Sequence, residues 1–138
     1  MTENLLEVPL VCVLDDDRQI RDAIDALLRS AGFAVRTFAS PVEFLACGEA
    51  DNASCLILDI RLGEADGLEF QQRLSQSEVP IPVVLITGHG NIPMSVRAMK
   101  AGAVNFLSKP FGDNDLVAAV NEAVERGPGG RRTGEKRE

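Results

Sequence analysis

The chain has 138 residues, of which 45% are hydrophobic and 25% are charged, and this is typical of one globular domain. Its net charge of −7 argues against a broad nucleic-acid-binding surface, and no apolar stretch approaches the ~20 residues of a membrane span. The first nine residues show no basic segment before an apolar core, so we expect no secretory signal and a cytoplasmic protein.

Strand-like and helix-like segments alternate five times along the chain. Apolar or β-branched runs predict strands over residues 10–14, 33–38, 55–58, 83–86 and 105–108. Apolar residues at helical spacing predict a helix after each strand, around residues 20–28, 41–45, 67–74, 93–101 and 113–125. This alternation predicts an α/β fold, with a single doubly wound parallel sheet of five strands and five helices on its two faces.

Capping and stop signals set the boundaries of these elements. Asp17 can cap the first helix and Ser40 the second. Residues 127–130, Gly-Pro-Gly-Gly, end the last helix and indicate a flexible segment. We therefore expect one domain over residues 1–126 and a flexible, Gly- and Arg-rich tail or linker over 127–138.

Three cysteines, Cys12, Cys47 and Cys55, show no CxxC spacing, and two of them lie inside apolar runs. An odd number without that spacing favours reduced thiols over a disulfide framework. A single histidine, His89, also excludes a metal cluster built from several cysteines and histidines.

Residues that can handle a phosphoryl group end four of the predicted strands. Asp15 and Asp16 follow the first strand, Asp59 the third, Thr87 the fourth and Lys109 the fifth. Because the carboxyl ends of parallel strands lie along one edge of a sheet, we expect these side chains to gather there. Adjacent carboxylates repel one another unless a cation lies between them, and an all-oxygen ligand set suits Mg²⁺.

Each of these residues also has a simpler explanation when it is taken alone. An aspartate after a strand often turns the chain or caps the next helix, which is the interpretation we prefer for Asp17. A lysine such as Lys109 is commonly a surface residue, and a threonine such as Thr87 is favoured in strands. The coincidence of four strand endings favours a functional site.

Asp59 is the best candidate for a nucleophile, because it stands alone at its strand end with Asp15 and Asp16 across from it. A carboxylate can attack phosphorus and form an aspartyl phosphate, and this reaction depends mainly on positioning and charge neutralisation. Lys109 can neutralise one phosphoryl oxygen, and Thr87 can donate a hydrogen bond to another.

Four motifs resemble those of the receiver domains of bacterial two-component response regulators, and the resemblance covers roughly residues 8–126. They are Leu-Asp-Asp-Asp at 14–17, Leu-Asp-Ile-Arg-Leu at 58–62, Thr-Gly-His-Gly at 87–90 and Phe-Leu-Ser-Lys-Pro-Phe at 106–111. The Thr-Gly-His-Gly motif, followed by Ala-Met-Lys-Ala-Gly-Ala at 98–103, is most similar to the FixJ-type subgroup. The resemblance implies a flavodoxin-like sheet with strand order 2-1-3-4-5.

The resemblance also implies how the acidic residues act. Asp59 would accept a phosphoryl group from a sensor histidine kinase. The side chains of Asp16 and Asp59 and the backbone carbonyl of Arg61 would bind Mg²⁺, and Asp15 would act through the water shell of the metal.

The remaining site residues would form a switch. Thr87 and Lys109 would contact the phosphoryl group. Phe106 would be the switch aromatic, turning inward as Thr87 moves toward the phosphate. The Lys109–Pro110 peptide bond would be cis.

As its output, the domain would change the surface of its fourth helix, fifth strand and fifth helix, where Val96, Met99 and Lys100 are candidates. This change would control homodimerisation or an output partner, either a separate protein or a DNA-binding domain such as FixJ-type relatives carry after the receiver. The receiver itself would contact neither nucleic acid nor membrane. It would be no enzyme beyond self-phosphorylation from small phosphodonors and autodephosphorylation.

Two loop residues add finer expectations. Gly63 stands where the family usually has a proline, four residues after the phosphoacceptor, and it predicts a more mobile loop. His89, two residues after Thr87, could gate the attacking water or could be an idle loop residue.

Two other functions fit parts of the pattern. A Mg²⁺-dependent phosphatase could work through an aspartyl phosphate, but Arg61 stands where a second aspartate would be expected, and no inserted cap region is present. A phosphorylation-independent interaction module would not need the complete set of acidic, hydroxyl and ammonium groups.

Overall fold

The structure is a computed structural model, and it describes residues 8–48, 52–62, 65–76, 81–88 and 92–127. One parallel sheet contains the strands β1 (Leu10–Leu14), β2 (Ala34–Phe38), β3 (Cys55–Asp59), β6 (Val83–Thr87) and β7 (Asn105–Ser108). Their order is β2-β1-β3-β6-β7, which confirms the predicted order 2-1-3-4-5. The predicted tail beyond residue 127, and the loop residues Gly63 and His89, lie outside the described residues.

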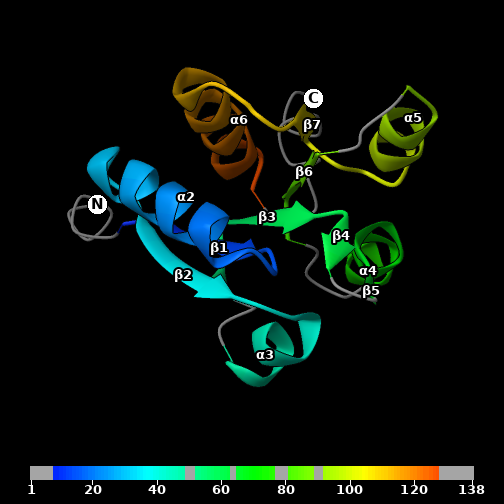
Figure 1. The fold of residues 1–138 in the computed structure, drawn as a ribbon, viewed down its shortest axis with the longest axis horizontal. Helices are drawn as coiled ribbons and strands as arrows, with labels where there is room; N and C mark the ends of the chain where they lie inside the picture. The colour runs from blue at the N-terminus through cyan, green and yellow to red at the C-terminus, as the bar shows by residue number, and fades with distance from the viewer. Residues whose placement is uncertain (1–7, 49–51, 63–64, 77–80, 89–91, 128–138) are drawn as a thin grey trace, which may run out of the picture.

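Helices cover both faces of the sheet (Figure 1). The first face carries α2 (Arg18–Ser30) and α6 (Asp113–Arg126), and the second carries α3 (Pro41–Ala46), α4 (Gly67–Ser75) and α5 (Ile92–Lys100). Successive strand residues point to opposite faces, so Val11 and Cys12 belong to two different core clusters. Because both faces are covered, the central strands are apolar up to Leu14, Leu58 and Ile86, as the sequence predicts.

The predicted caps are present. Asp17 Oδ1 accepts a hydrogen bond from Gln19 N at 2.9 Å at the start of α2, and Ser40 Oγ accepts one from Glu43 N at 3.2 Å at the start of α3. The end of α5 is closed by Gly102, which adopts a φ of 101° that favours glycine. Helix α2 extends two residues beyond the predicted range at each end, and the other helix boundaries lie within one residue of the predicted ones.

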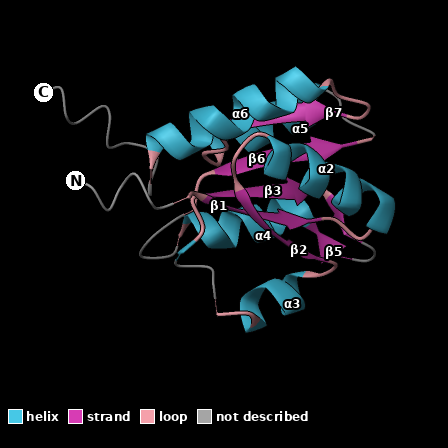
Figure 2. Ribbon diagram, turned by 90° about the vertical axis from the view of Figure 1, so that its left-hand side faces the viewer, coloured by secondary structure: helices cyan, strands magenta, loops and turns pink. Residues whose placement is uncertain are grey.

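The strand register places the carboxyl ends at one level. Asp59 pairs with Ile86, and Thr87 pairs with Ser108, so the ends of β3, β6 and β7 lie side by side. Figure 2 shows the arrows of the large sheet pointing the same way, toward one edge. Residues that follow β1, β3, β6 and β7 therefore meet at this edge.

A small hairpin that the sequence did not predict lies between β3 and α4. Its strands, β4 (Arg61–Leu62) and β5 (Ala65–Asp66), pair in antiparallel orientation. The chain then enters α4 at Gly67, where a Cβ atom would lie 2.3 Å from the carbonyl oxygen of Asp59. This close approach requires glycine and couples the start of α4 to the end of β3. Among the described helices, none is long and apolar enough to cross a membrane.

Candidate functional site

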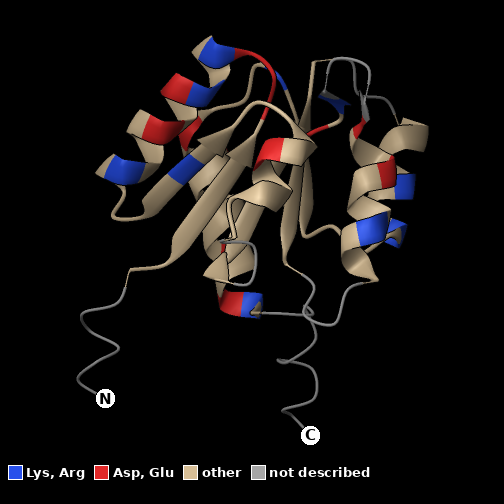
Figure 3. Ribbon diagram, turned by 90° about the horizontal axis from the view of Figure 1, so that it is seen from below, with Lys and Arg blue, Asp and Glu red and all other residues tan. Residues whose placement is uncertain are grey.

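Three aspartates gather at the carboxyl ends of β1 and β3, which are neighbours in the sheet. One carboxylate oxygen from each of Asp15, Asp16 and Asp59 lies within 4.8 Å of the others. Asp15 and Asp59 are buried, with 0% and 4% of their surface exposed, whereas Asp16 is exposed. Figure 3 shows the acidic loop between β1 and α2 as a red segment beside the strand ends.

Lys109 brings a positive charge to this group from the end of β7. Its Nζ lies 3.0 Å from Asp15 Oδ2 and 3.2 Å from Asp59 Oδ2. The backbone N–H of Lys109 donates to the carbonyl of Thr87 at 2.7 Å, and the Lys109–Pro110 peptide bond is cis. The ammonium therefore bridges the two buried carboxylates.

Backbone N–H groups hold the other oxygen of each buried carboxylate. Asp17 N donates to Asp15 Oδ1 at 2.9 Å, and Arg61 N donates to Asp59 Oδ1 at 3.1 Å. Each carboxylate is thus fixed on one side by the backbone and on the other by Lys109. This arrangement fixes the orientation of both groups before any ligand arrives.

Most of the predicted site residues line one open cavity of about 310 Å³. Its lining residues are Asp15, Asp16, Asp17, Asp59, Arg61, Gly88 and Lys109. Thr87 is fully buried and is absent from the lining of this cavity, to which its neighbour Gly88 belongs. Phe106 is half-buried on β7 and packs against the core cluster under α4 and α5.

The three carboxylates of the site carry more negative charge than the Lys109 ammonium neutralises. Burial, followed by the charge of Asp15, raises the pKa of Asp59, and although the Arg61 N–H and Lys109 offset part of this effect, the pKa reaches about 6. Burial by itself would lower the pKa of Lys109, but its hydrogen bond to Asp15 and the charges of Asp59 and Asp15 outweigh burial and raise it. Lys109 therefore stays protonated, and a further cation would stabilise the charged form of Asp59.

A hard divalent cation fits these residues. The three clustered groups offer carboxylate oxygens alone, which are the ligands that Mg²⁺ and Ca²⁺ prefer. The raised pKa of Asp59 reflects burial first and repulsion from Asp15 second, and a bound cation would favour the charged carboxylate against both. Together with the Lys109 ammonium, the site can neutralise an incoming phosphoryl group beside a carboxylate nucleophile.

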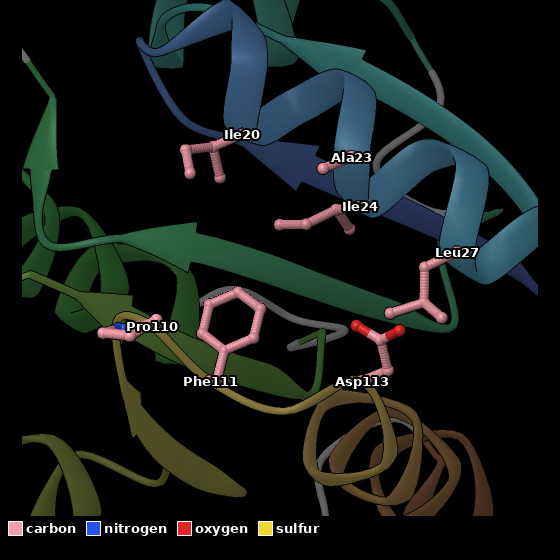
Figure 4. A pocket seen from close by; sticks show the side chains of 7 residues that line it. All are labelled: Ile20, Ala23, Ile24, Leu27, Pro110, Phe111 and Asp113. Atoms are coloured by element: carbon pink, nitrogen blue, oxygen red, sulfur yellow. The ribbon is translucent and has the colours of Figure 1, made fainter.

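A second, apolar cavity of about 200 Å³ lies between α2 and the segment that joins β7 to α6. In Figure 4, side chains from one face of α2 point toward Phe111, with Pro110 and Asp113 beside it. The lining residues on α2 are Ile20, Ala23, Ile24 and Leu27. Pro110 follows Lys109 directly, so this cavity adjoins the acidic one.

Two residues at the site carried no signal that the sequence analysis detected. Arg21 Nη1 donates to the backbone carbonyl of Asp15 at 2.7 Å, and a contact to a backbone acceptor leaves no pattern of residue types. Gly67 packs against the backbone of Asp59. The Asp-Gly pair at 66–67 is the pattern from which this close approach could have been predicted.

Comparisons with known proteins agree with this geometry. The family "Response regulator receiver domain" matches residues 11–121. Nodulation protein W of Bradyrhizobium diazoefficiens is 49% identical over 117 residues, which are 85% of this chain and 52% of that protein. Transcriptional regulatory protein FixJ of the same species is 40% identical over 116 residues, which are 84% of this chain and 57% of that protein.

A solved structure with a similar fold belongs to another response regulator. It is a response regulator protein from Burkholderia pseudomallei with a phosphorylated aspartic acid, a calcium ion and citrate, and it is similar with a TM-score of 0.74 and 28% sequence identity. The match covers 85% of this chain and 69% of that one. This chain spans about half the length of the curated relatives described above. It belongs to the response regulator receiver domains, in the FixJ-type subgroup, whose members are phosphorylated on an aspartate in two-component signalling.

Proposed function

We propose that Asp59 is the phosphoacceptor of this receiver and that a sensor histidine kinase is its phosphodonor, in a reaction that requires Mg²⁺. The observation that carries the proposal is the position of the Asp59 carboxylate, between two other aspartates and the Lys109 ammonium in one open cavity. The calcium ion in the Burkholderia pseudomallei structure supports a divalent metal in the family. Mg²⁺ is the specific ion that we propose for this chain.

Asp59 and Lys109 have different roles in the proposed transfer. Asp59 Oδ2, the oxygen not held by the Arg61 N–H, forms the bond to phosphorus while the bond from phosphorus to the kinase histidine breaks. The leaving imidazole keeps its electron pair. Lys109 transfers its hydrogen bond from Asp59 to a phosphoryl oxygen.

Asp16, Asp59 and the Arg61 carbonyl would hold Mg²⁺, with Asp15 acting through its water shell. When bound, the ion supplies positive charge that offsets the clustered carboxylates and the phosphoryl oxygens. Asp15 would hold the Lys109 ammonium in place after Asp59 is phosphorylated, because Asp15 Oδ2 lies 3.0 Å from Lys109 Nζ. The protein's contribution is thus a fixed arrangement of charges that a phosphoryl group completes.

The switch would begin at Thr87 and end on the surface of α5, β7 and α6. The Thr87 hydroxyl would move to the phosphoryl group, and Phe106, which is half-buried, would turn into the space that this movement opens. The surface of α5 exposes Ile92, Val96 and Met99, of which Val96 and Met99 are each 46% exposed. This apolar surface supports a homodimer or an output partner there.

The apolar cavity beside α2 supports a docking place for the kinase. A protein that delivers a phosphoryl group to Asp59 must cover the surface around the acidic cavity. The adjoining cavity offers Ile20 and Phe111 for an apolar anchor next to the kinase histidine. We propose that this cavity takes an apolar side chain from the helix that carries that histidine.

We also propose the domain boundaries and the cellular compartment of the chain. The end of α6 at Arg126 supports a receiver over residues 1–126, followed by a tail or linker over 127–138. The three cysteines of the sequence show no CxxC spacing, and this supports a reducing compartment such as the cytoplasm.

Intact mass spectrometry after incubation with acetyl phosphate tests the proposal. With Mg²⁺, the native protein should gain one phosphoryl group, and the adduct should be labile to hydroxylamine. The gain should vanish with EDTA and in Asp59→Asn. An adduct that persists in Asp59→Asn would refute Asp59 as the acceptor.

A further inference from the structure

Arg21 contacts the acidic loop in a way that its neighbours on α2 do not. Its Nη1 donates to the backbone carbonyl of Asp15 at 2.7 Å, a short charge-assisted hydrogen bond at a half-buried position. Arg18 forms an ion pair with Asp22 one turn along the helix, and Arg29 pairs with Asp25 and donates to the carbonyl of Val35, far from the acidic loop in sequence. Arg21 thus ties α2 to the end of β1.

The carbonyl that Arg21 holds belongs to the peptide that joins Asp15 to Asp16. Asp15 is fixed in further ways, because its N–H donates to Phe38 O at 3.2 Å and its carboxylate has two partners. Asp16 differs, since no described residue forms a hydrogen bond or an ion pair with its carboxylate. A planar peptide fixes the Cα atom that follows it, so the direction of the Asp16 side chain depends on this peptide.

We infer that Arg21 is a positioning residue of the metal site, and that it directs Asp16 toward the ion by fixing the Asp15–Asp16 peptide. This inference rests on the proposed function, because it concerns the ligand set proposed there. Partners of metal ligands in other proteins act in the same way, by fixing the ligand's orientation before the metal binds.

Charge and positioning predict opposite results for this residue. Arg21 adds a positive charge beside three carboxylates, so by Coulomb's law alone its removal should tighten the binding of a cation. If Arg21 positions Asp16, its removal should weaken binding, because Asp16 must then be ordered when the ion binds. The sign of the change therefore separates the two effects.

The test is isothermal titration calorimetry of the protein with Mg²⁺, using native protein, Arg21→Gln, Arg21→Lys and Arg18→Gln. Arg18→Gln is the matched control, because it removes the same charge from the same helix at an exposed position. We expect Arg21→Gln to weaken Mg²⁺ binding about tenfold, at the low end for partners of metal ligands. Arg21→Lys should recover part of the loss, and Arg18→Gln should bind as tightly as native protein or slightly tighter.

A double-mutant cycle shows whether the effect passes through Asp16. Asp16→Asn should cost less affinity in the Arg21→Gln background than in the native one. Circular dichroism shows which variants fold, and Arg21→Lys takes the place of Arg21→Gln in the cycle if the latter is unfolded. Equal or tighter Mg²⁺ binding by Arg21→Gln, or an additive cycle, would overturn the inference.

Phosphorylation assays distinguish an error in the role of Arg21 from an error in the proposed function. With acetyl phosphate, Arg21→Gln should need more Mg²⁺ for half-maximal labelling but reach the native plateau. If native protein binds Mg²⁺ and is labelled while Arg21→Gln matches it at every Mg²⁺ concentration, the role of Arg21 alone is wrong. If native protein binds no Mg²⁺, the proposed metal site and the role of Arg21 are both wrong.

Discussion

Lys109 and Asp59 are joined across the end of the sheet, although their strands are not neighbours. Lys109 Nζ lies 3.2 Å from Asp59 Oδ2, and β6 lies between β7 and β3. The pair places a fixed positive charge over the proposed phosphoacceptor before a phosphoryl group arrives. It also means that Asp59 loses this contact, at least in part, when it is phosphorylated.

Lys109→Gln should destabilise the metal-free protein. The variant leaves two buried carboxylates without the cation that bridges them, and breaking such a partly buried pair costs about 2 kcal/mol or more. Mg²⁺ should restore more stability to this variant than to native protein, because the ion replaces the missing charge. Urea unfolding followed by circular dichroism measures both effects, since the chain has no Trp or Tyr for fluorescence.

Lys100→Gln is the matched control, since Lys100 is an exposed lysine on α5. Its stability should match that of native protein with and without Mg²⁺. A Lys109→Gln variant that unfolds at the native urea concentration in EDTA would show that Lys109 does not compensate the carboxylates.

Asp59→Asn should stabilise the metal-free protein at neutral pH. The pKa of Asp59 is raised to about 6, so the folded state holds a proton that the unfolded chain releases near pH 4. The free energy of unfolding therefore falls as the pH rises from about 4 to 6, and the charged carboxylate destabilises the fold above that range. The asparagine of the variant carries no charge, so the variant avoids this destabilisation. Its free energy of unfolding should exceed that of native protein by about 2 kcal/mol at pH 7.5 in EDTA.

Urea titrations of both proteins at pH 4.5 and pH 7.5 measure the difference. The gain should shrink at pH 4.5, where native Asp59 is protonated in the folded state. Saturating Mg²⁺ at pH 7.5 should also reduce the gain, because it stabilises native protein more than the variant. A gain of the same size at both pH values would contradict the account of the Asp59 environment.

Ala23→Arg should block transfer from the kinase and leave chemistry at Asp59 intact. Ala23 is exposed on α2 and lines the apolar cavity, so a long charged side chain would fill that cavity without disturbing the core. Transfer from a phosphorylated histidine kinase should slow at least about tenfold, as for loss of a central interface contact. Labelling by acetyl phosphate should stay at the native rate.

Ala26→Arg is the control for charge and helix propensity, because Ala26 is exposed on the same helix and does not line the cavity. It should accept phosphate from the kinase at the native rate. Equal transfer rates for both variants would place the kinase elsewhere on the receiver.

Gly67→Ala should destabilise the protein and weaken the site together. The new Cβ atom would meet the Asp59 carbonyl at 2.3 Å, so α4 or the end of β3 must shift. Overpacking of this kind costs about 1 to 3 kcal/mol, and acetyl phosphate labelling should slow as Asp59 moves. Gly112→Ala is a milder comparison, because its Cβ would lie 3.3 Å from the Asp115 side chain. Native stability in Gly67→Ala would contradict the close approach.

The layered fold was predictable because its signals are local and repeat. Apolar strands such as Val83–Thr87 and caps such as Asp17 and Ser40 each have a recognisable pattern, and alternation then determines the parallel sheet. The hairpin of β4 and β5 was not predicted. Strands of two residues are too short to show a period.

The acidic cluster was predictable for a related reason, since parallel strands end at one edge and so bring distant residues together. Finer features depend on backbone atoms. Arg21 donates to a carbonyl and Gly67 makes room for one, and neither interaction depends on the type of residue that supplies the carbonyl. The burial of Thr87 outside the cavity lining likewise follows from packing and not from the order of residues.

The most direct test of the account is to locate the phosphoryl group on the chain. Protein labelled with acetyl phosphate and Mg²⁺ is reduced with borohydride, which converts a phosphorylated aspartate to homoserine, and its peptides are sequenced by mass spectrometry. We predict homoserine at position 59 alone, with Asp15 and Asp16 unmodified. Modification at Asp15 or Asp16 in native protein, or no modified aspartate in protein shown to bind Mg²⁺, would contradict the assignment of Asp59 as phosphoacceptor.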